Sequence, residues 1–241
     1  MYKGIYVAMT GAQLKYQELD NVTQNLANAN TAGYKKTSFS TRLYPLLEGI
    51  ADKQKAVYPD ARSMTVMGKT SIDTSAGSLM ETGNTLDLAC VGEGFFAVQA
   101  GDNIYYTRNG SFARGKDGYL VDDSGQQVLD TNNKPIRIAG NTVQFSSDGT
   151  LYVDGAATDK LKVVNLDRAT MQHIGNSLFS GTETGASNAE VVQGSVEMSN
   201  VNPIKEMAGM ITALRDMDII SKVIKTFDTL AENAVTQIAK V

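Results

Sequence analysis

Residues 217–241 read MDIISKVIKTFDTLAENAVTQIAKV, and the spacing of the apolar side chains in this stretch decides the fold class. Gaps of three and four residues alternate without a break, which is the repeat of an α-helix that buries one seam against another helix. The stripe consists of Met217, Ile220, Ile224, Phe227, Ala231, Ala234, Ile238 and Val241. The sequence therefore predicts a coiled-coil-like helix at the C-terminal end of the chain.

The stripe is expected to continue upstream, through Ile204, Met207, Ile211 and Leu214. Pro203 suits the first position of this helix, and Asn202 suits the position before it, where its side chain can cap free backbone N–H groups. We expect the helix to run from Pro203 to about Ala239. On its outer face Asp218 and Lys222 lie one turn apart and are expected to form a weak ion pair.

A second apolar stripe with the same spacing occupies the N-terminal end of the chain. It consists of Ile5, Met9, Ala12, Tyr16, Leu19, Val22, Leu26 and Ala29. The pattern stops at residues 30–33, where Gly33 can adopt the left-handed backbone conformation that ends helices. The sequence thus predicts a helix at each end of the chain.

The residues between the two helices have the composition of a β domain. Glycine-containing turn pairs recur among short β-branched and aromatic runs, at Asn109-Gly110, Asp117-Gly118, Ser124-Gly125, Asp148-Gly149 and Asp154-Gly155. Such a pattern is typical of antiparallel hairpins. We therefore expect an α+β fold in five segments: an N-terminal helix in 1–36, an extended connector in 37–85, a central antiparallel β domain in 86–166, a second connector in 167–202, and a C-terminal helix in 203–241.

Two details indicate that the terminal helices pair with each other and contact further copies of the chain. Both stripes lie at the extreme ends of the sequence, and residues 23–34 carry no charged side chain. An uncharged surface suits a helix that touches protein on several faces. The alternative is an ordinary α+β monomer in which both helices pack on the β domain.

Composition argues against several classes of function. The chain has 241 residues, a net charge of -4 and scattered basic residues, so it has no electrostatic footprint for nucleic acid. It contains no apolar run of about 18 residues and no signal peptide at its start, so we expect no transmembrane segment and no export by a cleaved signal.

The reactive side chains do not combine into a catalytic, metal or cofactor site. Cys90 is the single cysteine and lies in an apolar run, so it is interpreted as core packing, while His173 is the single histidine and is expected to be exposed. Gly92 and Gly94 fit part of a dinucleotide fingerprint, but a strand-like run follows them, which favours a hairpin turn. Arg108 is interpreted as paired locally in a tight turn. We expect no cofactor and no enzymatic activity.

Three segments resemble those of flagellar rod and hook proteins. TQNLANANTAGYKK, at residues 23–36, is similar to the N-terminal signature of this family, an Asn-Leu-Ala-Asn core followed by Asn-Thr-x-Gly, an aromatic residue and a basic residue. Two later segments agree in the same order: LDLACVGEGFFAVQ with YTRNGSFARGKDGYLVDDSGQQVL, in 86–129, and GSVEMSNVNPIKEMAGMI at 194–211. The chain is therefore identified as a member of the flagellar basal-body rod family.

Within the family, hook proteins are usually much longer, and distal rod proteins typically carry extra residues after the signature turn. The stretch between Gly33 and Leu86 is short here, so the chain resembles proximal rod proteins first and distal rod proteins next. A coiled-coil surface protein with a β domain is the remaining alternative.

The resemblance implies a structural subunit that polymerises helically through its terminal helices, as part of the drive shaft and of the export channel wall. Its partners would be other copies of itself, neighbouring rod proteins and the flagellar type III export apparatus, and it would lie in the rod that crosses the periplasm. The residues expected at its assembly interface are Leu19, Val22, Asn25, Leu26, Asn28, Asn30, Gly33, Tyr34, Asn200, Asn202, Ile211, Leu214, Ile220, Ile224, Phe227, Ala231 and Ile238.

Overall fold

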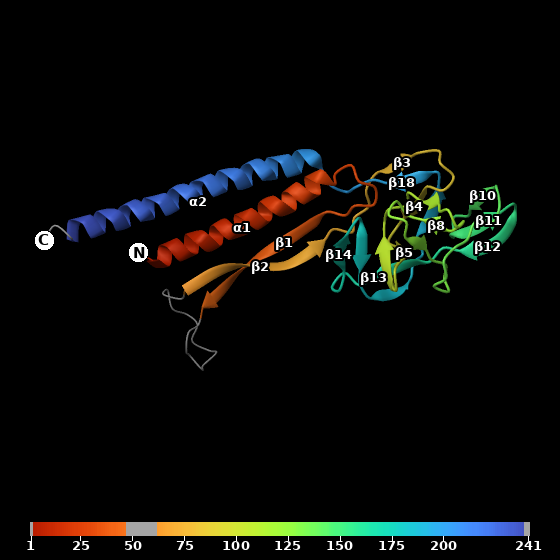
Figure 1. Ribbon diagram of the computed structural model, residues 1–241, viewed down its shortest axis with the longest axis horizontal. Coiled ribbons are helices and arrows are strands. Elements are labelled where there is room, and N and C mark those ends of the chain that lie inside the picture. The colour runs from red at the N-terminus through yellow and green to blue at the C-terminus, as the bar shows by residue number, and fades with distance from the viewer. Residues whose placement is uncertain (1, 47–61, 239–241) are drawn as a thin grey trace, which may run out of the picture. The chain divides into compact units, whose positions relative to one another are not determined.

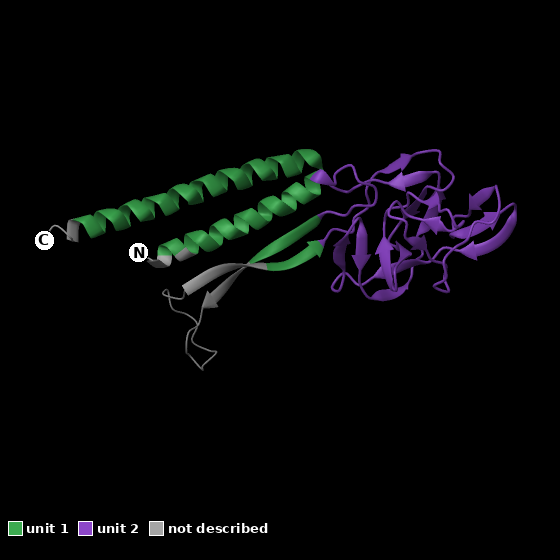
Figure 2. Cartoon of the chain, in the orientation of Figure 1, with its two compact units in different colours: residues 1–26, 37–71, 202–241 green, residues 27–36, 72–201 purple. Residues whose placement is uncertain are grey.

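The computed structural model describes residues 2–46 and 62–238, and the chain forms two compact units (Figure 2). Unit 1 contains residues 1–26, 37–71 and 202–241, and unit 2 contains residues 27–36 and 72–201. Each unit is therefore assembled from segments that are far apart in the sequence.

Unit 1 holds the two long helices, α1 at Tyr2–Ala27 and α2 at Pro203–Ile238, which lie side by side (Figure 1). The start of α2 is capped as predicted, because the side-chain Oδ1 of Asn202 accepts hydrogen bonds from the backbone N–H groups of Ile204 and Lys205, both at 3.1 Å. The predicted helix at each end of the chain is confirmed.

Helix α1 ends two residues before the apolar stripe does. Its last residue is Ala27, and Asn28 and Ala29 lie in a turn in which the N–H of Thr31 donates to the carbonyl of Asn28 at 3.1 Å. Gly33 has a φ of +68°, so the predicted left-handed conformation is confirmed.

The stretch expected to be the first connector contains strands. Strands β1, at Thr37–Leu46, and β2, at Arg62–Ile72, form a two-stranded sheet (Figure 1), and β3, at Leu79–Glu81, pairs with a strand near the end of unit 2. The stretch 37–85, which was expected to be an extended connector, therefore contains paired strands.

Unit 2 is built from short antiparallel strands. In its main sheet the strands follow the order β14-β15-β6-β5-β9-β8-β7, and β13 pairs with both β5 and β16. Smaller sheets have the orders β10-β11-β12, β17-β4 and β18-β3. The bounds are β4 Leu88–Val91, β5 Phe95–Ala100, β6 Asn103–Thr107, β7 Ala113–Arg114, β8 Leu120–Val121, β9 Gln127–Val128, β10 Val143–Phe145, β11 Thr150–Val153, β12 Ala156–Lys160, β13 Val163–Leu166, β14 Gln172–Gly175, β15 Leu178–Ser180, β16 Glu183–Ala186, β17 Glu190–Gln193 and β18 Ser195–Glu197. The predicted central antiparallel β region and the α+β class are confirmed.

Residues 167–202 were expected to be a connector, but strands β14 to β18 lie within them. Their partners are distant in the sequence: Phe179 of β15 pairs with Tyr106 of β6, and Val191 of β17 pairs with Cys90 of β4. Short strands rich in Gly, Ser and Thr carry little local signal, because their stability comes from side chains packed across the sheet.

The core of unit 2 consists of two clusters on opposite faces of β5. Phe96 and Val98 point into a cluster that includes Cys90, while Phe95 and Ala97 point into a cluster that includes Phe179. Alternate residues of a strand face opposite sides, so a strand that is apolar at every position is buried on both. Cys90 is 1% exposed, which confirms that it packs in the core.

Candidate assembly interface

Within unit 1, α1 and α2 approach each other where α1 carries glycine. A Cβ atom added to Gly4 would lie 2.8 Å from the ring of Phe227, and one added to Gly11 would lie 3.9 Å from Cδ1 of Ile220. Glycine permits this close approach because it has no side chain. Phe227 and Ile220 therefore face α1.

Burial along α2 follows one helical face. Most of the C-terminal stripe is half-buried: Met217, Ile220, Ile224, Phe227, Ala231 and Ala234. On α1 the expected interface residues Leu19, Val22 and Leu26 are also half-buried. Ile238 ends α2, and its side chain lies outside the described residues. The C-terminal stripe is thus the inner face of α2.

The upstream residues Ile211 and Leu214 do not continue this inner face. Their side chains are 53% and 48% exposed, and Ala213 is buried between them. The reason lies in the spacing, because the steps from Ile211 to Leu214 and from Leu214 to Met217 are both three residues. Two short steps in succession rotate an apolar stripe around a helix of 3.6 residues per turn. The expected continuous seam was wrong here, and α2 has a separate outer apolar face.

The described ion pairs of Lys15 and Lys222 with residues of α1 and α2 lie near the surface. Lys15 of α1 donates to Glu18 at 2.8 Å and to Asp216 of α2 at 2.9 Å, and both carboxylates raise its pKa. The predicted pair of Asp218 and Lys222 is confirmed at 3.8 Å, with both side chains exposed. Exposed pairs contribute at most about 1 kcal/mol, so these particular pairs add little to the packing of the two helices.

Asn25 lies inside unit 1 rather than on its surface. Its side-chain Nδ2 donates to the carbonyl of Thr37 at 2.9 Å and to Glu206 at 3.4 Å, while its Oδ1 accepts from the N–H of Thr37 at 3.0 Å. Asn25 and Glu206 are both almost fully buried. Asn25 therefore joins the end of α1 to the start of β1.

The last part of the signature turn after α1, at residues 33–35, is buried within unit 2. The N–H of Gly33 donates to the backbone carbonyl of Glu197 at 2.7 Å, and a Cβ atom at Gly33 would lie 2.0 Å from the backbone nitrogen of Asn109. Tyr34 is 3% exposed. Asn28 is half-buried and Asn30 is exposed. The glycine of this turn is thus required by close backbone packing as well as by its positive φ.

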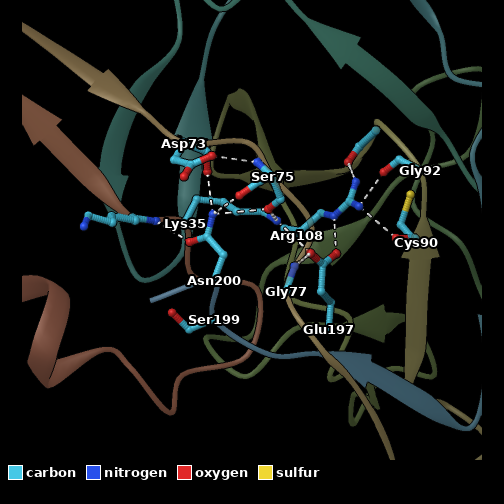
Figure 3. Close-up of polar contacts among 12 residues, drawn as sticks. Lys35, Asp73, Ser75, Gly77, Cys90, Gly92, Arg108, Glu197, Ser199 and Asn200 are labelled. Carbon is cyan, nitrogen blue, oxygen red and sulfur yellow. Dashed lines mark hydrogen bonds and ion pairs between the residues drawn. The ribbon is translucent and has the colours of Figure 1, made fainter. Parts of the chain in front are cut away.

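Next to this turn, three charged side chains form a buried cluster (Figure 3). Nζ of Lys35 lies 2.6 Å from Oε1 of Glu197, and Nε of Arg108 lies 2.5 Å from Oε2 of the same carboxylate. Burial lowers the pKa of Lys35, an effect that Glu197 opposes. Burial alone would raise the pKa of Glu197, but Arg108 and Lys35 hold it below its usual value. The cluster is therefore a buried carboxylate held between two basic side chains.

The guanidinium of Arg108 also organises the segment after β4. Its Nη2 donates to the carbonyls of Cys90 at 2.8 Å and Gly92 at 2.5 Å, and its Nη1 donates to the carbonyl of Gly94. The Gly92–Gly94 segment was expected to form a hairpin turn, but β4 pairs with β17 instead, so this expectation was wrong. The segment wraps around Arg108, whose carboxylate partner Glu197 is distant in sequence rather than local.

Asn200 and Asn202 connect the end of unit 2 to α2. Oδ1 of Asn200 accepts from the N–H of Lys36 at 2.7 Å, and its Nδ2 donates to the carbonyls of Asp73 at 2.9 Å and Ser75 at 3.2 Å. Asn202 is the cap of α2 described above. Asn200 therefore links its own segment by hydrogen bonds to two others, at Lys36 and at residues 73–75.

His173 is not the exposed side chain that the sequence suggested. Its ring packs edge-on against Tyr34, at 5.6 Å between centroids, and against Phe179, at 5.3 Å. Burial lowers the pKa of His173, and its Nε2 atom is buried without a hydrogen-bond partner among the described residues. His173 was misjudged because the residues that cover it, Tyr34 among them, are remote in the sequence.

Lys35, Arg108 and Glu197 were not predicted from the sequence to form a group. The available signal was the charge of Glu197 beside Val196 in a segment that alternates apolar and polar residues, but its partners are remote. Within residues 2–46 and 62–238, no group of three or more His, Cys, Asp or Glu side chains is placed to hold a metal ion. Neither described helix combines the length and apolarity that crossing a membrane requires.

Three family models match successive parts of the chain. The model described as "Flagella basal body rod protein" matches residues 5–35, "Flagellar hook protein FlgE/F/G D1 domain" matches residues 89–153, and "Flagellar basal body rod FlgEFG protein C-terminal" matches residues 192–237. Lys35, Arg108 and Glu197 each lie in a different one of these matches.

Relatives align over nearly the whole chain. The flagellar basal-body rod protein FlgG of Agrobacterium fabrum is 32% identical, over 95% of this chain and 97% of its own. FlgG of Bacillus subtilis is 30% identical over 98% of each chain, and FlgF of Mesorhizobium japonicum is 29% identical over 98% of this chain and 97% of its own. With similarity of this extent, and with terminal helices flanking a central antiparallel β region, the chain belongs to the flagellar basal-body rod protein family.

Proposed function

We propose that the chain is a subunit of the proximal rod, and that its copies assemble helically through α1 and α2 to form part of the drive shaft and of the export channel wall. In this proposal α1 and α2 pair like a coiled coil inside each subunit, and the outer face of α2 packs on neighbouring subunits. The partners are other copies of the chain and adjacent rod proteins.

The observation that carries this proposal is the outer apolar face of α2. Ile211 and Leu214 lie on a part of the helix that α1 does not cover. The large apolar side chains exposed along α2 are Ile204, Met207, Ile211, Leu214, Ile219, Val223, Leu230 and Val235. Isolated exposed apolar residues are ordinary, but the first four of these recur at gaps of three, four and three residues and so form a row on one face of α2, which marks a surface that another protein covers. We infer that helices of neighbouring copies cover it.

Helix α1 contributes to the same assembly. Its exposed apolar side chains are Val7, Met9 and Tyr16, while Leu14 is buried. Met9 and Tyr16 are seven residues apart and therefore share one face of α1, which is available to a neighbour because the inner side of α1 is used within the subunit. Each helix then has one face for its own partner helix and another for assembly.

The residues of the signature turn have a different role in this proposal. Gly33, Tyr34 and Asn25 are buried within their own units, and Asn200 bonds to backbone groups of unit 2. In this proposal each stabilises the unit that contains it and does not contact neighbouring copies. The assembly surface itself is therefore restricted to exposed positions of α1 and α2, such as Ile211 and Leu214.

The proposed route and location follow from membership of the family. Rod proteins belong to the flagellar basal body, and we propose that this chain is exported by the flagellar type III apparatus, without a cleaved signal, into the rod that crosses the periplasm. The chain carries a single cysteine, so it can form no internal disulfide that would obstruct passage of an extended chain.

A distal rod subunit is the second candidate. The relatives named FlgG are 32% and 30% identical to this chain and the relative named FlgF is 29% identical, so identity slightly favours the distal type. The short stretch between Gly33 and Leu86 favours the proximal type.

Basal bodies purified from cells that lack this chain distinguish the two candidates. A proximal subunit must be in place before the distal rod can be added, so we expect its loss to remove the other distal rod proteins from the preparation. Retention of a complete proximal rod would instead identify the chain as a distal subunit. Quantitative mass spectrometry of the rod proteins is the measurement.

A further inference from the structure

The buried cluster of Lys35, Arg108 and Glu197 joins three parts of unit 2 that are far apart in the sequence. Lys35 and Glu197 are 162 residues apart, and Arg108 and Glu197 are 89 residues apart. Each of these side chains is at most 3% exposed. The cluster therefore exists only when the first and last segments of unit 2 are both present.

The charges of the cluster depend on Glu197. Lys35 and Arg108 repel each other, and Glu197 is the carboxylate that bonds to both. Their other acceptors here are backbone carbonyls, of Ser75 for Lys35 and of Cys90, Gly92 and Gly94 for Arg108. Asp73 also attracts Lys35, but its side chain is exposed. Without Glu197, closing unit 2 would bury two cations without a buried carboxylate, which is strongly unfavourable.

The opposite end of the unit is equally necessary. Residues 27–36 supply Lys35 to the carboxylate and the Gly33 N–H to the backbone carbonyl of Glu197. They also supply Tyr34, which packs against His173. A chain without this segment would leave Arg108 as the one cation on the Glu197 carboxylate, and it would leave the backbone carbonyl of Glu197 without the N–H of Gly33.

We propose that the cluster is a closing clasp: unit 2 completes its fold only when residues 27–36 and residues 195–200 are both in place. A chain that emerges gradually from either end would keep unit 2 open until Lys35 and Glu197 can meet. The benefit to a subunit delivered in an extended state rests on the proposed export, whereas the clasp itself does not.

The clasp makes a kinetic prediction that simple stabilisation does not. If unit 2 must wait for Glu197, the contacts of Glu197 form in the rate-limiting step of folding, and removing its charge slows folding. If Glu197 joins after unit 2 has closed, removing its charge only accelerates unfolding. The change in the folding rate, compared with the change in the unfolding rate, therefore decides whether Glu197 joins before or after unit 2 has closed.

Cys90 reports on the closure of unit 2 in the full-length chain. It is the only cysteine, it lies in the core of unit 2, and burial raises the pKa of its thiol, so it reacts slowly with thiol reagents while the unit is closed. Refolding from urea, followed by pulses of a thiol-labelling reagent, gives the rate at which Cys90 becomes protected. Transfer of the folded protein into urea gives the rate at which Cys90 loses this protection.

We expect Glu197→Gln to slow the protection of Cys90 by at least about 10-fold and to change the unfolding rate less. The control is Glu190→Gln, which makes the same change at an exposed position of β17 and should leave both rates within about twofold. Adding Lys35→Met to Glu197→Gln removes one of the unmatched cations, so the double variant should refold faster than Glu197→Gln alone.

An unchanged protection rate in Glu197→Gln, with faster unfolding alone, would overturn the clasp. A double variant that refolds no faster than Glu197→Gln would also overturn it, because the delay would then not arise from unmatched charge. If Glu197→Gln yields no folded protein, the double variant decides: recovery of protected Cys90 supports the clasp, and failure to recover contradicts it.

Discussion

Glu197 accepts hydrogen bonds from three donors, Lys35 Nζ, Arg108 Nε and the backbone N–H of Gly77, at 2.6, 2.5 and 2.7 Å. Charged and almost fully buried, it costs free energy unless every partner is present. Single residues of this kind, together with Gly33 and His173, determine how the ends of unit 2 fit together. For His173 and Gly33 we predict the effect of changing a single side chain.

His173 makes the stability of unit 2 sensitive to acid. Burial lowers its pKa in the folded protein, whereas the unfolded chain has the ordinary value of about 6.5. Below that pH the unfolded state binds more protons, so stability from this group is complete above about pH 6.5 and is lost as the pH falls toward the folded pKa.

Urea unfolding of the wild type and of His173→Phe at pH 7.5 and pH 5.5 measures this effect. We expect the wild type to lose more stability between the two pH values than His173→Phe, which keeps a ring against Tyr34. Because His173 is the only histidine, nuclear magnetic resonance of its ring gives the folded pKa directly. A folded ring that titrates with an unshifted midpoint would refute the prediction.

Gly33 tolerates no side chain, for two independent reasons. Its φ is +68°, and a Cβ atom would lie 2.0 Å from the backbone nitrogen of Asn109. We expect Gly33→Ala to lower the stability of unit 2 by more than about 2 kcal/mol, since backbone strain and a clash with backbone act together. The control is Gly83→Ala, where φ is also positive but nothing lies within 4 Å of the new Cβ. Equal urea midpoints for the two variants would contradict this account.

At the scale of elements, the two faces of α2 have different tasks. The inner face, which includes Ile224 and Phe227, lies against α1, and the outer face, which includes Ile211 and Leu214, is exposed. Helix pairs are stabilised mainly by packing of apolar faces. Mutations on the two faces should therefore act differently.

Ile224→Asp tests the inner face. A carboxylate at this half-buried position should destabilise the helix pair by about 1–3 kcal/mol, whereas Lys225→Asp, at the next and exposed position, should change stability by less than about 0.5 kcal/mol. Thermal unfolding followed by circular dichroism of both purified variants is the measurement. If the two variants melt together, Ile224 does not pack on α1.

At the scale of the whole molecule, the chain passes back and forth between its two units, so that Lys35 and Glu197 belong to one unit and Asn25 and Glu206 to the other.

Because each unit combines segments that are distant in the sequence, only features with a local pattern could be predicted from the sequence. The helices were predictable because their pattern is local: α2 begins at Pro203 as expected and is described as far as Ile238, whereas the expected end at about Ala239 lies outside the described residues.

Features that depend on distant partners were not predictable in the same way. The sequence of β17 indicates a connector, and only its pairing with β4 makes it a strand. The sequence around His173 indicates an exposed side chain, but Tyr34 packs against it in the fold. The clasp residues likewise appear unrelated until the fold brings them together across 162 residues. The outer face of α2 was visible in the sequence as Ile211 and Leu214, but it was assigned to the wrong side of the helix because two short steps shift the stripe.

The most direct test of the account is incorporation of Ile211→Asp into rods. Ile211 is 53% exposed in the subunit, so the variant should keep the melting temperature of the wild type, yet it places an unpaired carboxylate in the proposed contact with neighbouring copies. Thr212→Asp is the matched control, since it adds the same charge at an exposed neighbouring position about 100° around the helix. We predict that basal bodies from cells expressing Ile211→Asp lack complete rods, whereas those expressing Thr212→Asp contain them. Complete rods in similar numbers for both variants would contradict the claim that the outer face of α2 builds the rod.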